Sequence, residues 1–300
     1  MKQHTLKESF TLRSVGLHTG LDIAATFHPA PENTGICLRR VDLPKQPCHQ
    51  ALADYVSATE RGTVLEYGKW RISTVEHALS ALYALGVDNC VIDVNAPEMP
   101  ILDGSAKPFV NEILRVGLQE QDAEQKVFIV KEPFEYISEH GNSLRIEPCD
   151  HYEVDVTIAF PSQLLREQHA TLKDLATYPK EIAAARTFCF VREIEPLLRV
   201  GLIKGGDLKN ALVIYETEMS QEGMDYFCDK MGQPHLDASK LGYLSPLNYL
   251  NEPARHKLLD VIGDMSLLGL RIQGRIVAFK PGHTFNTRCV KQLRNQILSE

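Results

Sequence analysis

Ionisable side chains recur every four positions inside the apolar segment 251–264. On an α-helix, at about 100° per residue, His256, Asp260 and Asp264 share one stripe, and Lys257 lies at its margin. Apolar residues cover the other sides, which predicts a helix that is buried nearly all round. An unpaired buried charge is costly, and His and Asp at i and i+4 can reach one divalent metal ion. An exposed amphipathic helix with solvated charges is the alternative that this segment leaves open.

A second helix is predicted around Glu76 and His77, beginning after Ser73 and ending at Gly86. The helix face that carries His77 otherwise has small residues, and no Lys, Arg, Asp or Glu occurs between His77 and Gly86. Small side chains let another backbone approach, so we expect His77 to lie away from bulk water. Two other interpretations stay open: Glu76 binds the amide of Ser73 in a capping box, or His77 is a core histidine with satisfied nitrogens.

Together the two helices offer His77, His256 and Asp260 as metal ligands, with Glu76 beside them as a carboxylate that need not bind the metal. Three protein ligands and an open position are typical of catalytic zinc, whereas structural zinc has four ligands, usually including Cys. The seven cysteines never form C-x-x-C. Their odd, scattered occurrence favours thiols in a reducing compartment over a disulfide framework.

These helices need sheets to position them, and the chain is long enough for two domains. With 300 residues, of which 44% are hydrophobic, each half can bury its own core. The polar run 119–126 is the predicted linker, which gives domains 1–121 and 127–300. Segments typical of strands lie at 22–27, 35–40, 89–95, 127–137, 143–147, 153–160 and 270–279, and further helices at 105–116 and 286–300.

Each half places several strands before a His-bearing helix that leads into another apolar strand, which indicates an internal duplication. We therefore predict an α+β fold of two similar domains, each a β-sheet layer with helices. The domains pack as a sandwich with the helices at the interface.

Several motifs occur in order along nearly the whole chain. They are Val15-Gly16-Leu17-His18-Thr19-Gly20, Ser73-Thr74-Val75-Glu76-His77, the run 94–105, Ala185-Arg186-Thr187-Phe188, His256-Lys257-Leu258-Leu259-Asp260 with Asp264, and Gly282-His283. In these motifs the chain resembles the UDP-3-O-acyl-N-acetylglucosamine deacetylases, the LpxC family of zinc enzymes in bacterial lipid A biosynthesis. The resemblance implies hydrolysis of an N-acetyl group on a UDP-linked, 3-O-acylated sugar, with release of acetate.

The resemblance also implies roles for individual residues. It makes His77, His256 and Asp260 the ligands of one zinc ion per chain, for which iron(II) is an alternative in cells, and Glu76 the general base. His283 is similar to the family's cationic histidine, which stabilises the oxyanion and assists departure of the amine. Asp264 matches the carboxylate that orients this histidine, and Thr187 and Lys257 match residues that bind the substrate and its developing charge.

A hydrophobic insert at 188–217 is similar to the family's passage for the 3-O-acyl chain. The substrate-binding residues expected here and elsewhere are His18, Phe188, Phe190, Leu198, Gly206 and Lys257. Ordinary core packing is the alternative for the insert, and a hairpin position before the Thr19-Gly20 turn is the alternative for His18.

Two departures from the family pattern stand out. Some members carry a cysteine near the metal where this chain has Thr59-Glu60-Arg61-Gly62-Thr63. The segment 219–250 also looks longer than the usual connection. A noncatalytic nucleotide-sugar or metal-binding protein is the other function class, but such a protein would not need Glu76, His283 and Asp264.

The composition of the chain limits the classes of molecule that it could bind. The net charge of −7 disfavours nucleic-acid binding, and Lys204-Gly205-Gly206 lacks the spacing of an ATP-binding loop. A diphosphate needs local cations, for which His18, Lys204, Lys209 and Lys257 are candidates. No leader and no long apolar run is found, so we expect a cytoplasmic protein. The lipid substrate implies peripheral membrane association, and some family members are fused to an acyl-carrier-protein dehydratase.

Overall fold

The computed structural model describes residues 1–194 and 204–299, which form two α+β halves around two adjacent helices. The N-terminal half holds a 5-stranded sheet in the order β2-β3-β9-β4-β5. Its strands are β2 (Phe10–Val15), β3 (Asp22–Pro29), β9 (Cys90–Val94), β4 (Ile36–Arg40) and β5 (Cys48–Gln50). The C-terminal half holds the order β12-β13-β19-β14-β15, with β11 also paired to β19. Those strands are β11 (Val127–Ile129), β12 (Phe134–Ile137), β13 (Ser143–Glu147), β14 (Tyr152–Ala159), β15 (Glu167–Leu172) and β19 (Arg271–Phe279).

The two main sheets repeat one topology, which confirms the predicted duplication and the α+β fold class. In each sheet the central strand, β9 or β19, pairs antiparallel on one side and parallel on the other. A helix precedes that strand and another follows it. These helices are α1 (Glu76–Ala84) and α2 (Lys107–Val116) around β9, and α6 (Glu252–Ser266) and α7 (His283–Ser299) around β19.

Each half also carries an insertion between an edge strand of its main sheet, β5 or β15, and the helix before its central strand, α1 or α6. In the N-terminal half this is a sheet of β6 (Val56–Ala58), β7 (Val64–Tyr67) and β8 (Trp70–Ser73) after the 3-10 turn η1 (Ala53–Tyr55). In the C-terminal half it contains η2 (Leu175–Thr177), α3 (Tyr178–Glu181), β16 (Phe188–Phe190), β17 (Leu212–Tyr215), α5 (Gln221–Lys230) and β18 (Gly242–Tyr243). The predicted strand 127–137 is interrupted in the structure, where β11 and β12 are separate strands.

The run 119–126 is not the linker that its polar composition predicted. Residues Leu118–Glu124 form β10, which pairs antiparallel with β1 (Lys2–Leu6). Backbone hydrogen bonds hold such a strand at the sheet edge even though its side chains are polar and exposed. Because this pairing reaches Glu124, β10 extends past the predicted first domain, and the boundaries at 121 and 127 stay a prediction.

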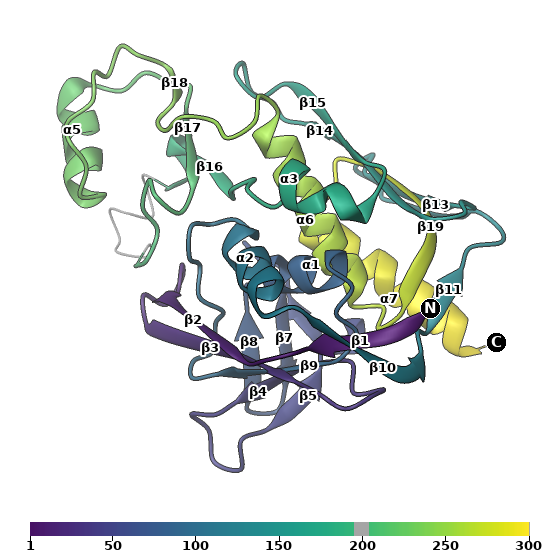
Figure 1. Cartoon of the computed structure of the whole chain (residues 1–300). Helices are drawn as coiled ribbons and strands as arrows, with labels where there is room; N and C mark the ends of the chain where they lie inside the picture. The colour runs from purple at the N-terminus through teal and green to yellow at the C-terminus, as the bar shows by residue number, and fades with distance from the viewer. Residues whose placement is uncertain (195–203, 300) are drawn as a thin grey trace.

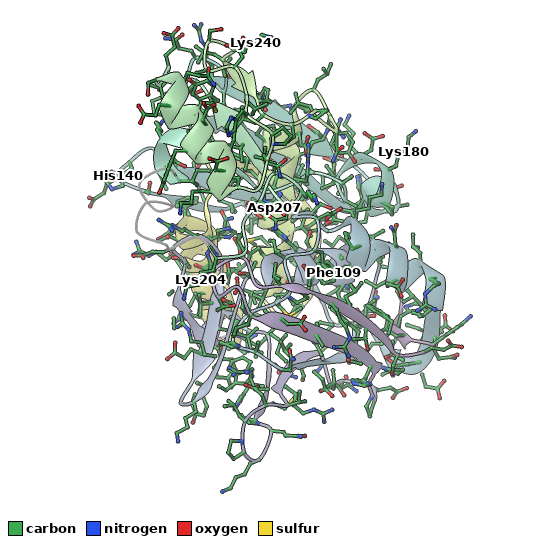
Figure 2. All side chains as sticks on the ribbon, turned by 90° about the vertical axis from the view of Figure 1, so that its left-hand side faces the viewer. Phe109, His140, Lys180, Lys204, Asp207 and Lys240 are labelled. Carbon is green, nitrogen blue, oxygen red and sulfur yellow. The ribbon has the colours of Figure 1, made fainter. Side chains whose placement is uncertain are left out.

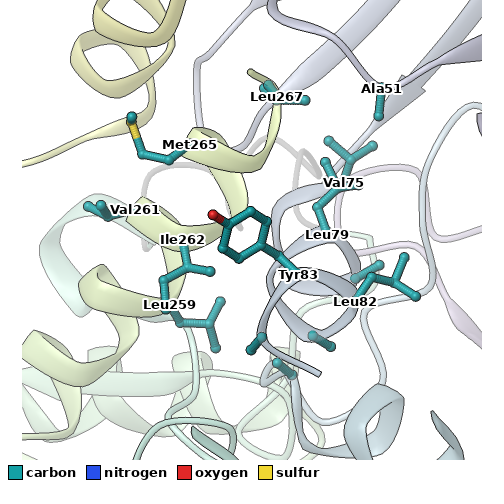
Figure 3. Packing of buried hydrophobic residues seen from close by; sticks show 14 of the residues in the cluster. Ala51, Val75, Leu79, Leu82, Tyr83, Leu259, Val261, Ile262, Met265 and Leu267 are labelled. Carbon is teal, nitrogen blue, oxygen red and sulfur yellow. The ribbon is translucent and has the colours of Figure 1, made fainter. Parts of the chain in front are cut away.

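The helices α1 and α6 lie side by side between the two halves (Figure 1). Both are buried nearly all round, as predicted for α6, and Figure 3 shows Leu79 and Tyr83 of α1 opposite Leu259 and Ile262 of α6. Gly263 brings the two backbones together, since a Cβ at this position would lie 2.3 Å from the carbonyl oxygen of Glu76. The close packing places the polar residues of both helices at one point.

A second, smaller core lies under β17 and α5 and is separate from the main one. Buried side chains in it include Val213, Tyr215, Met224 and Phe227. Figure 2 shows Lys204 and Asp207 between this region and the N-terminal sheet. The insertion therefore has its own core and lies beside the first half of the chain.

Candidate active site

Three buried side chains from α1 and α6 form a group that could hold a metal ion. The ligand atoms offered by His77, His256 and Asp260 all lie within 4.8 Å of one another. His256 Nδ1 lies 3.0 Å from the carbonyl oxygen of Ala185, to which it donates, and this leaves Nε2 facing Asp260 Oδ1 at 3.4 Å. The imidazole rings of His77 and His256 meet edge to face, with centroids 5.1 Å apart.

The polar atoms of this group fit a bound cation. Asp260 Oδ2 accepts a hydrogen bond of 2.8 Å from Lys257 Nζ, but the buried Oδ1 has no hydrogen-bond partner among the described residues. A buried oxygen without a partner is costly unless a cation satisfies it. Burial, together with the nearby His256, lowers the pKa of His77 to about 3, so His77 is in the neutral form that binds metals.

Glu76 is a buried carboxylate beside the triad and does not cap its helix. Its Oε2 accepts a 3.1 Å hydrogen bond from the Thr63 backbone N–H, while the Ser73 N–H donates to the Pro97 carbonyl instead. The capping box left open by the sequence is therefore not formed. Burial raises the pKa of Glu76 to about 7, with His283 opposing this change. A carboxylate with this pKa is suited to act as a general base near neutral pH.

His283 begins α7 and faces Glu76 across the site. Its Nε2 lies 3.8 Å from Glu76 Oε1, and its Nδ1 lies 3.0 Å from Asp264 Oδ2. Burial alone would lower the pKa of His283, but Asp264, Asp260 and Glu76 raise it to about 9. Two neighbouring groups whose environments separate their pKa values in this way are suited to act as a base, here Glu76, and an acid, here His283.

Sequence reasoning missed two residues that hold Asp264. Thr63 Oγ1 donates to Asp264 Oδ1 at 2.6 Å, and Asn286 Nδ2 donates to Asp264 Oδ2 at 2.9 Å. Thr63 was noted only because its loop lacks a cysteine. A polar side chain three residues after His283, on the same helix face, is the signal that could have indicated Asn286.

Two more buried carboxylates position the site from a distance. Glu98 accepts hydrogen bonds from the His18 and Thr19 backbone, and so fixes the turn that carries His18. Glu252 pairs with Arg186 at 2.8 Å, which fixes the segment that presents Ala185 to His256. Glu98 lies inside one of the sequence motifs, and that was the only signal for it.

A cavity of about 360 Å³ is lined by the three side chains of the triad, by Glu76 and by His283. Of the remaining predicted residues, it is also lined by His18, Thr187, Phe188, Gly206 and Lys257. Asp264 lies behind His283. Burial alone would lower the pKa of Lys257, but the neighbouring Asp260 raises it, so Lys257 keeps its charge. Its Nζ lies 5.5 Å from the centre of the Phe188 ring.

Phe190, Lys204 and Lys209 do not line this cavity, and a fourth predicted residue lies outside the part of the chain that the structure describes. Phe190 does not line the cavity, because its buried ring packs between Phe160 and Arg192. Leu198 lies outside the described residues. The proposed phosphate cations Lys204 and Lys209 are exposed and do not line the cavity either.

Fold and site together define a duplicated α+β protein with a buried His, His, Asp triad beside an acid–base pair, an arrangement typical of metal-dependent hydrolases. The chain matches the model of the LpxC family, UDP-3-O-acyl N-acetylglycosamine deacetylase, over residues 3–230 and 236–295. It belongs to this family. The match omits only 231–235 within the segment 219–250 that looked longer than usual.

Named relatives cover almost the whole chain. A bifunctional enzyme LpxC/FabZ of Bacteroides thetaiotaomicron is 53% identical over 300 residues, which are 99% of this chain and 65% of the relative. The bifunctional enzyme of Porphyromonas gingivalis is also 53% identical, over 99% of this chain and 65% of its own length. A UDP-3-O-acyl-N-acetylglucosamine deacetylase of Syntrophus aciditrophicus is 38% identical over 98% of this chain and 86% of its own length. The chain thus spans slightly less than two thirds of the bifunctional relatives.

Within residues 1–194 and 204–299, every helix is too short or too polar to span a lipid bilayer.

Proposed function

We propose that this chain is a zinc-dependent deacetylase acting on UDP-3-O-(3-hydroxyacyl)-N-acetylglucosamine. It hydrolyses the N-acetyl group and releases acetate, the committed step of lipid A biosynthesis. The observation that carries the proposal is the position of Glu76 and His283, 3.8 Å apart on the edge of the triad. The name of the relative from Syntrophus aciditrophicus supports this substrate class.

His77, His256 and Asp260 would hold the zinc ion, with Asp260 Oδ1 gaining the partner that it lacks. When bound, zinc supplies a Lewis acid that polarises a carbonyl and favours ionisation of water. The carbonyl of Ala185 keeps His256 in the tautomer that a ligand requires. The three side chains are buried on two packed helices, so little rearrangement is needed for binding.

The proton transfers belong to the protein's own residues. Glu76 takes a proton from the water molecule that attacks the acetyl carbonyl, and the Thr63 N–H holds the carboxylate in place. Thr187 and Lys257 line the same cavity and stabilise the oxygen that becomes negative. His283 then donates its proton to the sugar nitrogen as the carbon–nitrogen bond breaks, so that the leaving group departs as a neutral amine.

One side of the cavity suits an acyl chain. Its lining there includes Cys189, Ile194, Ala211 and Val213 from the insertion. Burial of a methylene group contributes about 0.8 kcal/mol, so a long 3-O-acyl chain would supply much of the binding energy. The lipid substrate would bring a cytoplasmic enzyme into peripheral contact with the membrane.

The length of the bifunctional relatives suggests a further partner. Three relatives named LpxC/FabZ are longer than this chain, which covers 64% or 65% of each. We therefore propose that this chain is fused to, or works beside, an acyl-carrier-protein dehydratase. Mass spectrometry of the protein purified from its native cells tests for the fusion.

The function is tested by incubating the purified chain with the UDP-linked substrate and measuring acetate and the free amine. We expect equal amounts of the two products. Binding of the substrate without any acetate would instead support a noncatalytic nucleotide-sugar-binding protein. The matched substrate with an N-trifluoroacetamide in place of the acetamide should react faster, because its carbonyl is more electrophilic.

A further inference from the structure

A second group of side chains that could hold a metal ion lies on the connection between β13 and β14 and at the start of β14. Cys149, His151 and Glu153 each offer one ligand atom, and these atoms lie within 4.8 Å of one another. Asp150 adds a carboxylate that contacts both Cys149 and His151. In the described part of the chain, none of these four residues lines the cavity of the proposed deacetylase site.

The arrangement of these side chains follows from the extended backbone of the segment. Side chains alternate along an extended strand, so His151 and Glu153 share one face while Tyr152 points the other way. Tyr152 is buried against Tyr83, and the His151 carbonyl accepts a 3.0 Å hydrogen bond from the Gly274 N–H. This anchoring holds the outward face in a fixed position.

The distances from the Cys149 thiol to its two neighbours are close to those around a tetrahedral ion. Zinc–sulfur and zinc–nitrogen bonds of about 2.3 and 2.0 Å in a tetrahedron place the two ligand atoms about 3.5 Å apart. In the structure, Cys149 Sγ lies 3.7 Å from His151 Nδ1 and 3.8 Å from Asp150 Oδ1. The two distances from the thiol are therefore close to those in a zinc site, whereas His151 Nδ1 and Asp150 Oδ1 are hydrogen-bonded to each other and have to separate around an ion.

Glu153 supports the imidazole from its other side. His151 Nε2 lies 3.2 Å from Glu153 Oε1, to which it donates, and Nδ1 on the other side of the ring faces Cys149 and Asp150. Arg275 lies 3.5 Å from the other carboxylate oxygen of Glu153. A carboxylate that accepts the second ring N–H is the usual partner of a histidine that binds zinc.

We propose that Cys149, Asp150 and His151 bind a second divalent cation of borderline softness, such as Zn²⁺, with Glu153 orienting the histidine. A thiolate and an imidazole favour such a cation over magnesium or calcium, which prefer oxygen ligands. Three protein ligands leave one corner to solvent. The chain then binds two zinc ions, of which only the one at His77, His256 and Asp260 serves the proposed reaction.

Cobalt(II) distinguishes the two sites, because only a thiolate gives the intense charge-transfer absorption of a cobalt–sulfur bond. The triad of the proposed active site contains no sulfur. Titration of the reduced, metal-free protein with Co²⁺ should produce this absorption and saturate it at one thiolate-bound ion per chain. The absorption should disappear in Cys149→Ser and persist in His77→Ala.

Matched variants sharpen the test. Cys48→Ser removes another exposed thiol and should leave the absorption unchanged. Glu153→Gln should weaken cobalt binding by about 10- to 100-fold, as for other carboxylates that orient a ligating histidine. The proposal is wrong if wild-type protein shows no cobalt–sulfur absorption at saturating Co²⁺, if the absorption survives in Cys149→Ser, or if Cys48→Ser abolishes it. None of these outcomes depends on deacetylase activity.

Discussion

Gly263 of α6 packs directly on the backbone of Glu76 of α1. An added Cβ would lie 2.3 Å from the Glu76 carbonyl oxygen and 3.0 Å from its Cα, closer than side chains approach a backbone. This single contact sets how near the helix with His77 comes to the helix with His256 and Asp260. The proposed metal site therefore depends on a residue that carries no side chain.

Gly263→Ala should force the two helices apart. Overpacking of this kind costs about 1–3 kcal/mol of unfolding free energy, and we expect metal content to fall because the ligands of the two helices separate. Urea unfolding and elemental analysis measure the two effects. In the control Gly223→Ala, on α5, the nearest atom to the new Cβ is Ser220 Oγ at 3.3 Å, and no backbone atom is among its three nearest neighbours. Equal stability and metal content in Gly263→Ala and wild type would contradict this role.

Glu76→Gln separates the base from any structural role of Glu76. Glutamine keeps the shape and can still accept the Thr63 N–H, but it cannot take a proton. Turnover should fall by about 10²–10⁴ with little change in the urea midpoint. Glu66→Gln, at a half-buried position on β7 that does not line the cavity, serves as the control and should keep full turnover. Wild-type turnover in Glu76→Gln would show that another group is the base.

The helix that carries His256 could be predicted because the sequence pattern that indicates it is local. Residues four apart on a helix share a face, so the positions of His256, Asp260 and Asp264 follow from their spacing alone. Glu98 and Thr63 could not be found in this way. They act through hydrogen bonds to backbone groups or side chains far away in the sequence, and no periodicity records such contacts.

Among the strands, too, only those with a local sequence pattern could be predicted. The apolar runs predicted β9 and β19, whose side chains are buried between helices and sheet. The polar run at β10 gave no such signal, because an edge strand is held by backbone pairing with β1 and needs no buried side chains. The duplication was visible as a repeated order of elements, but the strand register that proves it required the structure.

The pH dependence of kcat/KM should be bell-shaped. Activity rises as Glu76 loses its proton, and burial raises the pKa of that carboxyl to about 7; a bound cation shifts this limb to lower pH. Activity falls as His283 loses its proton. Burial lowers the pKa of His283, but Asp264 and the other carboxylates raise it to about 9.

Asp264→Asn removes the negative charge nearest to His283, so the alkaline limb should move to lower pH. Asp155→Asn, which removes a carboxylate paired with Arg275 outside the site, should leave both limbs in place. Rate measurements across the pH range compare the two variants. An alkaline limb that stays in place in Asp264→Asn would show that Asp264 does not maintain the proton on His283.

The length of the 3-O-acyl chain should control kcat/KM. Each buried methylene contributes about 0.8 kcal/mol, which corresponds to roughly fourfold, until the chain fills the passage. Ala211→Leu narrows the apolar side of the cavity and should reduce the preference for long chains. The measurement compares a series of substrates with both proteins. Identical kcat/KM for acylated and deacylated sugars would mean that the insertion is only a packed core.

The dependence of acetate release on metal tests the central claim most directly. We expect protein stripped by a chelator to release no acetate, and one equivalent of Zn²⁺ to restore the reaction in a Cys149→Ser background, where the proposed second site is absent. The variant His256→Ala should stay inactive at the same zinc concentration. Full acetate release by the metal-free protein would contradict the assignment of His77, His256 and Asp260 as the ligands of a catalytic zinc ion.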